Sequence, residues 1–195
     1  LEVNDDVIIV VLASDHLIKD NNNFIDSLNS SISYAKSGYL VTFGVLPTYP
    51  ETGYGYIESN SELNVKTLEA MKIKKFIEKP DIKKAEKFVK NKKYSWNSGM
   101  FVFKAKTIIN ELEEFAPEIV KNCRSCIENS EKDLDFVRIN KKTFSNCPSL
   151  SIDVAVMEKT RLGLVVPLDA KWSDIGNWKS LWEYEKKNSD GNVLK

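Results

Sequence analysis

Residues 7–12 form an unbroken apolar run, and all but the last of them are β-branched. Such a run predicts a strand that is buried on both faces of a parallel sheet. After it, Asp20 offers an N-cap, and apolar residues recur at helical spacing as far as Gly38. Residues 39–45 then predict a second buried strand. A strand, a helix and a strand within about 40 residues make a βαβ unit, so an α/β fold is expected.

The remaining sequence continues this alternation. Further strands are expected at residues 55–58, 66–77, 98–103 and 164–167. Further helices are expected after the N-cap Asp81, over 108–115 and 119–127 on either side of Pro117, after Ser151, and from Trp178 onward. Trp178 and Trp182 share one helical face, and we expect both rings in the core.

Composition excludes several classes of protein. The 195 residues carry 28 Lys+Arg and 28 Asp+Glu, so the formal net charge is zero. A dedicated nucleic-acid binder is usually basic, and this balance argues against nucleic acid as a partner. No apolar run approaches the roughly 18 residues of a membrane span, so no membrane partner is expected. The length and the 42% hydrophobic content fit one ordinary globular domain.

Three cysteines are spread over the chain, and Cys123 and Cys126 form a Cys-x-x-Cys pair. A structural zinc site would need a second Cys/His pair, but the single histidine, His16, is far away in the sequence. The apolar spacing around the pair predicts an amphipathic helix, in which free cysteines act as small hydrophobic residues. Few cysteines and no pairing framework favour a reducing compartment, so a cytoplasmic location is expected.

Two aspartates lie where ligands bind in open α/β sheets, beyond the carboxyl ends of strands. Asp15 follows the first predicted strand, and Asp174 lies in a turn before a helix, with Gly176 allowing a tight backbone. Mg²⁺ is held by one or two carboxylates together with phosphate oxygens, so Asp15 is a candidate ligand, and Asp174 is a candidate site residue. On position alone, Asp15 is equally compatible with a turn or a helix cap.

Other segments offer groups that suit a hydroxyl-rich or phosphorylated ligand. Asn97 brings donors and acceptors to a polar elbow, although an Asx turn is the alternative. Gly55, in a Gly-x-Gly, would let the backbone approach a ligand closely. Lys79 is held between Glu78 and Pro80, where the backbone is restrained, and can act as a fixed charge for a phosphate.

Six segments stand in a characteristic order: ASDHLI (13–18), TGYGYI (52–57), FIEKPD (76–81), WNSGMF (96–101), SID with VMEKT (151–160) and WSDIGNW (172–178). Together they resemble the mannose-1-phosphate guanylyltransferases, a family of sugar-nucleotide nucleotidyltransferases. The family's form of the first segment is Pro-Ala-Asp-His-x-Ile, so alanine and serine stand here for proline and alanine. The resemblance covers essentially the whole chain.

The resemblance implies a partial doubly wound, Rossmann-like nucleotidyltransferase fold with a mixed sheet and flanking helices. Residues 1–195 would form the C-terminal portion of the catalytic domain, on its sugar-phosphate and metal side, with no second domain. The family's glycine-rich phosphate loop, G-G-x-G-x-R-L-x-P, has no counterpart in the sequence. We therefore expect the isolated chain to be inactive, and to expose apolar surface that favours a homo-oligomer.

The implied activity is transfer of GMP from GTP to mannose 1-phosphate, which gives GDP-mannose and pyrophosphate. The resemblance assigns Mg²⁺ or Mn²⁺ to Asp15 and Asp174, and these two residues with Lys79 would be catalytic. The implied substrate contacts are Gly55, Glu78, Lys79, Asn97 and Asp153. Asp153 is also compatible with a plain role in the first turn of a helix. Two alternatives stay open, a nucleotidyltransferase for another hexose 1-phosphate and a non-catalytic, sugar-phosphate-binding regulatory subunit.

Overall fold

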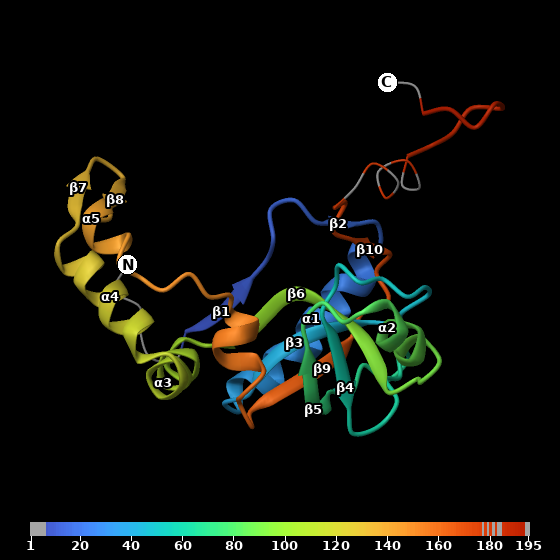
Figure 1. Ribbon diagram of the computed structural model, residues 1–195, viewed down its shortest axis with the longest axis horizontal. Helices are drawn as coiled ribbons and strands as arrows, with labels where there is room; N and C mark the ends of the chain where they lie inside the picture. The colour runs from blue at the N-terminus through green and yellow to red at the C-terminus, as the bar shows by residue number, and fades with distance from the viewer. Residues whose placement is uncertain (1–6, 177, 179, 181, 183–184, 194–195) are drawn as a thin grey trace.

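The computed structural model describes residues 7–176, 178, 180, 182 and 185–193. Its centre is a six-stranded mixed sheet with the order β1-β6-β3-β9-β5-β4 (Figure 1). The sheet strands are β1 (Ile8–Val11), β3 (Leu40–Val45), β4 (Tyr56–Ser59), β5 (Met71–Ile77), β6 (Tyr94–Lys104) and β9 (Gly163–Pro167). β2 (Leu17–Ile18) and β10 (Trp172–Ser173) form a separate antiparallel pair. The predicted α/β class with a mixed sheet is confirmed.

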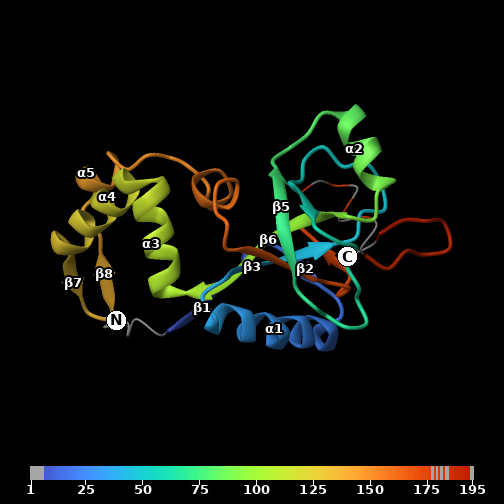
Figure 2. The ribbon, with the colours of Figure 1, turned by 90° about the horizontal axis from the view of Figure 1, so that it is seen from below.

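Helices cover both faces of the sheet (Figure 2). α1 (Asn21–Lys36) packs on one face, and Asp20 caps it by accepting from Asn23 N at 3.1 Å, as expected. The other face is covered by α3 (Ala105–Phe115) and by the single π-helical turn η1 (Asp153–Met157). Each layer buries its own apolar side chains against the sheet, which is the main favourable contribution to folding.

β3 is the buried strand that residues 39–45 predict. It runs parallel to β9 and antiparallel to β6, and its first five residues are buried. The other neighbouring pairs among the described sheet strands run antiparallel. Phe43 is fully buried in this strand, and its truncation to alanine would cost about 3–5 kcal/mol.

The first strand forms as predicted, but its expected surroundings are wrong. β1 lies at the end of the sheet and pairs with β6 in antiparallel register, Ile8 opposite Lys104 and Val11 opposite Phe101. Ile8 and Ile9 pack against the two opposite core layers, whereas Val11 is exposed. A continuous apolar run predicts a strand with two apolar faces, but it does not specify the direction of the neighbouring strand.

Several boundaries differ from the expectations. The strand expected at 66–77 begins only at Met71, and the short strand at 98–103 is part of the eleven-residue β6. The helix after Ser151 is the π-helical η1. The helix capped by Asp81 is α2 (Ile82–Val89), as predicted.

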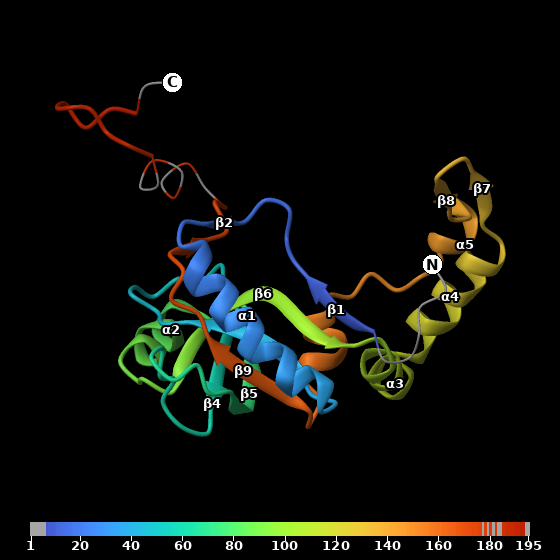
Figure 3. The ribbon, with the colours of Figure 1, turned by 180° about the vertical axis from the view of Figure 1, so that it is seen from behind.

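The segment after α3 extends away from the sheet (Figure 3). It contains α4 (Pro117–Glu128), β7 (Glu131–Asp133), β8 (Phe136–Arg138) and α5 (Lys141–Phe144). The sequence predicts α4 correctly, with Cys126 buried and Cys123 exposed, but it gives no sign of the β7–β8 hairpin. Leu134 at the hairpin tip is 95% exposed.

The core position expected for Trp178 and Trp182 is wrong. Trp178 is 86% exposed, and Trp182 is also exposed, with Lys187 Nζ 4.2 Å from its ring centroid. Helical spacing predicts a shared face, but it does not provide an element that covers that face. Within the described residues, no helix combines the length and the apolar character needed to cross a membrane.

Candidate functional site

Asn97 lies at the centre of a buried polar network on β6. Its Oδ1 accepts from Thr42 Oγ1 at 2.9 Å, and its Nδ2 donates to Asp153 Oδ1 at 3.0 Å. Its backbone N donates to the carbonyl of Gly55 at 2.8 Å. The residue is 9% exposed, so these bonds hold the amide in one orientation. The Asx-turn alternative is not what the structure shows, because the side chain bonds to other elements.

Gly55 precedes β4 and lies against two of the predicted site residues. A Cβ at this position would be 2.7 Å from Glu78 Oε2 and 3.5 Å from Asn97 Cβ. The antiparallel register of β4 with β5, Tyr56 opposite Ile77, accounts for this approach. A side chain at this position would therefore displace the carboxylate of Glu78.

Glu78 and Lys79 follow β5 and face Asp153. Lys79 has φ +43, a strained conformation for a residue with a side chain, and its Nζ lies 3.6 Å from Glu78 Oε1. Burial, and then the charge of Asp153, raises the pKa of the Glu78 carboxyl, while Lys79 opposes the shift. Burial also raises the pKa of Asp153. We call Gly55, Glu78, Lys79, Asn97 and Asp153 the Asn97 cluster.

A second group of side chains surrounds Asp174. The β2–β10 register pairs Ser173 with Leu17, and its continuation would set Asp174 beside His16, the neighbour of Asp15. Trp172 Nε1 donates to His16 Nδ1 at 3.2 Å, which ties the two strands together through side chains as well. The two predicted metal ligands thus lie at adjoining strand ends.

The Asp174 carboxylate is held by two donors. Its Oδ1 accepts from the Tyr54 hydroxyl at 2.8 Å and from Gly176 N at 3.1 Å. No bond to Oδ2 is found among the described residues. We call Asp15, His16, Tyr54, Trp172 and Asp174 the Asp174 cluster.

The Asp174 cluster offers too few protein ligands for a metal that is bound by protein groups alone. It suits Mg²⁺ or Mn²⁺, which can take the rest of their ligands from substrate and water. Within the described part of the chain, no group of three or more His, Cys, Asp or Glu side chains is placed to hold an ion. Mg²⁺ needs only one or two carboxylates when phosphate oxygens and water complete its shell. Asp15 is exposed and Asp174 has an oxygen without a described partner, so both carboxylates suit this role.

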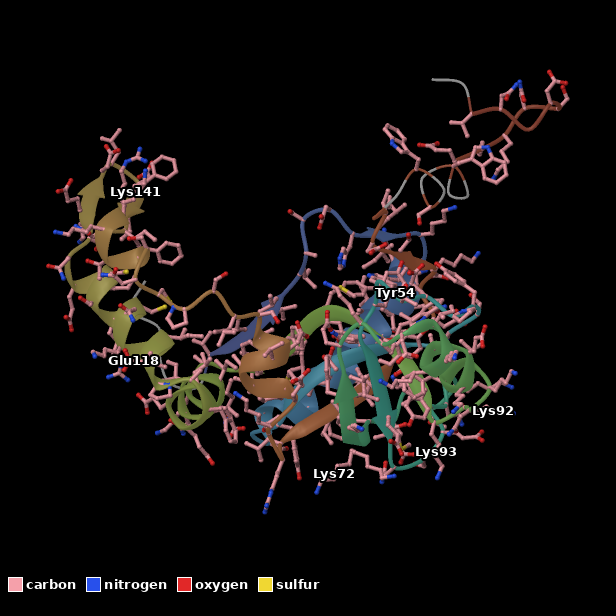
Figure 4. All side chains as sticks on the ribbon, in the orientation of Figure 1. Tyr54, Lys72, Lys92, Lys93, Glu118 and Lys141 are labelled. Atoms are coloured by element: carbon pink, nitrogen blue, oxygen red, sulfur yellow. The ribbon has the colours of Figure 1, made fainter. Side chains whose placement is uncertain are left out.

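Tyr54 joins the two clusters, and the sequence did not single it out. It precedes Gly55 in the chain and binds Asp174 through its hydroxyl. Figure 4 labels Tyr54 near the place where Figure 1 labels β10. The Gly-x-Gly around it is the only local signal, and it points to the glycines. The contact spans 120 positions, and sequence periodicity carries no information on such pairings.

A cavity of about 280 Å³ opens beside Tyr54. It is lined by aromatic rings and cations that include Lys19, Tyr49, Trp96, Lys171 and Trp172. The Tyr49 and Trp96 ring centroids are 4.9 Å apart with an edge-to-face geometry, so two packed aromatic rings form the wall on that side.

Comparisons with known proteins identify the family of the chain. The model of the Nucleotidyl transferase family matches residues 1–191. A mannose-1-phosphate guanylyltransferase of Escherichia coli is 44% identical over 98% of this chain and 41% of its own length. The mannose-1-phosphate guanylyltransferase RfbM of Salmonella typhimurium is 46% identical over 98% of this chain and 40% of its own length.

The chain thus spans about two fifths of the length of these curated relatives. Among solved structures, a mannose-6-phosphate isomerase from Helicobacter pylori superposes with a TM-score of 0.79 and 38% identity. That match covers 88% of this chain and 65% of the other. The family match extends over nearly all of the sequence, and the resemblance seen in the six motifs is confirmed. The chain belongs to the nucleotidyl transferase family.

Proposed function

We propose that this chain supplies the sugar-phosphate and metal side of a mannose-1-phosphate guanylyltransferase, which transfers GMP from GTP to mannose 1-phosphate. The observation that carries the proposal is the convergence of the Asn97 cluster from four separate elements. The names of the curated relatives, and that of the isomerase structure, support a phosphorylated mannose as the substrate class.

The Asn97 cluster has the chemistry that a phosphorylated sugar requires. Carboxylate oxygens of Glu78 and Asp153 accept hydrogen bonds from sugar hydroxyls, and the Asn97 amide both donates and accepts. Gly55 lets the backbone lie close to both Glu78 and Asn97. Lys79 provides the point charge for the phosphate, and its strained backbone fixes where the side chain starts.

In the proposed reaction, an oxygen of the sugar phosphate attacks the α-phosphorus of GTP in line. The new O–P bond forms as the bond to the β-phosphate oxygen breaks, and pyrophosphate leaves with its electron pair. No covalent bond to the protein is needed, so the contribution of the chain is positioning and charge stabilisation. Lys79 would orient the attacking phosphate, and the Asn97 cluster would hold its sugar.

Asp15 and Asp174 would hold Mg²⁺ or Mn²⁺. The bound ion would neutralise the phosphate charge that builds up in the transition state. The contribution of the chain is to present two carboxylates from adjoining strand ends, one of them held by Tyr54 and by Gly176 N.

GTP and mannose 1-phosphate are the proposed small-molecule partners, and the proposed location is cytoplasmic. Exposed apolar side chains on the β7–β8 hairpin, including Leu134 and Phe136, support the proposal of a homo-oligomer. Light scattering at several protein concentrations tests the oligomer, and a monomer at all of them would contradict it.

The test of the proposed function is calorimetric titration of the chain with mannose 1-phosphate. Asn97→Ala removes the amide proposed to bond the sugar, as well as the donor to Asp153. It should weaken binding by about tenfold, since a sugar hydroxyl left unpaired in the complex costs about 1–3 kcal/mol. Asn122→Ala, on the exposed side of α4, is the matched control and should bind as the unaltered chain does. Equal affinity for both variants would contradict a sugar site at Asn97.

Two further measurements separate the alternatives. Titration with glucose 1-phosphate and other hexose 1-phosphates tests the choice of sugar. Release of pyrophosphate from GTP by the complete enzyme, a chain that carries these residues together with a nucleotide-binding half, distinguishes an enzyme from a regulatory subunit.

A further inference from the structure

Tyr54 links the Asn97 cluster to Asp174, through its backbone on one side and its side chain on the other. Its backbone continues directly into Gly55, whose carbonyl accepts from Asn97 N. Its hydroxyl donates to Asp174 Oδ1 at 2.8 Å. Tyr54 is therefore a direct connection between the two clusters.

The ring of Tyr54 is fixed by two tryptophans from different strands. Its centroid lies 5.3 Å from that of Trp96 at 79°, and 5.4 Å from that of Trp172 at 60°. Trp96 immediately precedes Asn97, and Trp172 lies two positions before Asp174. The ring that carries the hydroxyl is thus held between a neighbour of Asn97 in the chain and a member of the Asp174 cluster.

The direction of the hydrogen bond is settled by chemistry. An ionised carboxylate can only accept, so the phenol donates. Tyr54 and Gly176 N both bond to Oδ1, which turns the carboxylate so that Oδ2 is left for another ligand.

We propose that Tyr54 is a positioning residue, which holds the Asp174 carboxylate in the orientation that receives a divalent cation. This inference deepens the proposed function and rests on it, since it assumes that Asp174 is a metal ligand. An aspartate side chain rotates about two bonds, and fixing it in advance removes that entropy cost from cation binding. Partners of this kind, which orient a metal ligand, typically contribute 10–100-fold to metal affinity.

The test compares Tyr54→Phe with Tyr94→Phe. Tyr94 donates a hydrogen bond to Glu58 Oε2 at 3.0 Å, so the control also loses a tyrosine–carboxylate bond, but outside both clusters. The probe is Mn²⁺ alone, titrated into the 195-residue chain and followed by electron paramagnetic resonance. Tyr54→Phe should weaken Mn²⁺ binding about tenfold, whereas Tyr94→Phe should stay within about twofold of the unaltered chain.

A second readout separates positioning from a general structural role. Without metal, the affinity of Tyr54→Phe for mannose 1-phosphate should stay within about twofold of the unaltered chain, because the phenyl ring still packs between the two tryptophans. In the complete enzyme, kcat should fall while KM for mannose 1-phosphate stays nearly constant. Thermal unfolding of both variants reports any loss of fold.

Three outcomes would overturn the inference. If Asp174→Asn abolishes Mn²⁺ binding but Tyr54→Phe and Tyr94→Phe bind Mn²⁺ equally well, Asp174 remains a metal ligand and the positioning role of Tyr54 is wrong. Unchanged Mn²⁺ binding by Asp174→Asn would remove the metal assignment together with the role of Tyr54. A loss of mannose 1-phosphate affinity in Tyr54→Phe would make it a sugar contact or a structural residue. A failure of Asn97→Ala to weaken sugar binding would contradict the proposed sugar site and leave Tyr54 untouched.

Discussion

Asn97 on β6 donates a hydrogen bond from Nδ2 to Oδ1 of Asp153 on η1, with the two atoms 3.0 Å apart. The bond connects the central sheet with the turn that covers one of its faces, and it places a carboxylate next to a buried amide. Burial of Asp153 raises the pKa of its carboxyl, and the Asn97 amide opposes the shift. A charged group kept in such a place, facing Glu78 and Lys79, is more readily explained by a polar ligand than by stability.

Gly55→Ala should impair the Asn97 cluster, because its Cβ would lie 2.7 Å from Glu78 Oε2. We expect Glu78 to be displaced and mannose 1-phosphate to bind at least about tenfold more weakly, from the loss of a charge-assisted hydrogen bond. Gly53→Ala is the matched control, since its Cβ would meet only the end of the Glu51 side chain at 3.2 Å. Calorimetric titration of both variants checks this, and equal losses would contradict it.

Lys79→Gly should separate stability from function. Lys79 has φ +43, and a glycine there would relieve strain of about 1 kcal/mol, partly offset by the greater freedom of glycine in the unfolded chain. We therefore expect an unfolding free energy that is unchanged or slightly higher, together with a clear loss of affinity for mannose 1-phosphate. Urea denaturation and calorimetry measure the two effects.

The control for this prediction is Lys171→Gly. Lys171 has φ 51, so replacing it with glycine relieves the same kind of backbone strain, but Lys171 lies outside the Asn97 cluster. It should show the stability effect without the loss of sugar-phosphate affinity. A destabilised Lys79→Gly, or one with unchanged binding, would count against the assignment.

The sequence predicts individual helices and strands better than it predicts the contacts between elements that are distant in the chain. Hydrophobic spacing locates α1, β3 and α3, because each element places its own apolar residues at a regular period. It does not give the antiparallel partner of β1 or the covering of Trp178, which depend on distant segments. The motifs locate Asn97 and Asp174, but the contact of Asp174 with Tyr54 follows from the tertiary structure alone.

The free energy of unfolding should fall as the pH rises above the acid range, because Asp153 in the Asn97 cluster loses its proton. Burial raises the pKa of Asp153 in the folded chain above its ordinary value of 3.8. Between that value and the raised one, the folded state binds more protons than the unfolded state, so the free energy of unfolding decreases with rising pH. Below pH 3.8 the stabilisation from protonated Asp153 is fully present, and above the raised pKa this stabilisation is lost.

Asp153→Asn should remove this part of the pH dependence, because the amide does not ionise. The measurement is the free energy of unfolding of the chain and of the variant from acid to neutral pH. The stability of the variant relative to the unaltered chain should increase across the window. Asp26→Asn, on the exposed face of α1, is the control and should leave the pH profile in place. Parallel profiles for Asp153→Asn and the unaltered chain would contradict the raised pKa.

Asp15 and Asp174 should behave as a single unit toward metal. The β2–β10 pairing sets them at adjoining strand ends, and one ion held by both would lose most of its affinity when either carboxylate is neutralised. We expect Asp15→Asn and Asp174→Asn each to weaken Mn²⁺ binding strongly, and the double variant to be little worse than either one, since residues that share one ligand are not additive. In the complete enzyme, each change should reduce kcat far more than it raises KM for mannose 1-phosphate, because the charge is needed in the transition state. Additive losses of Mn²⁺ affinity, or a loss confined to one of the two variants, would show that the carboxylates do not share an ion.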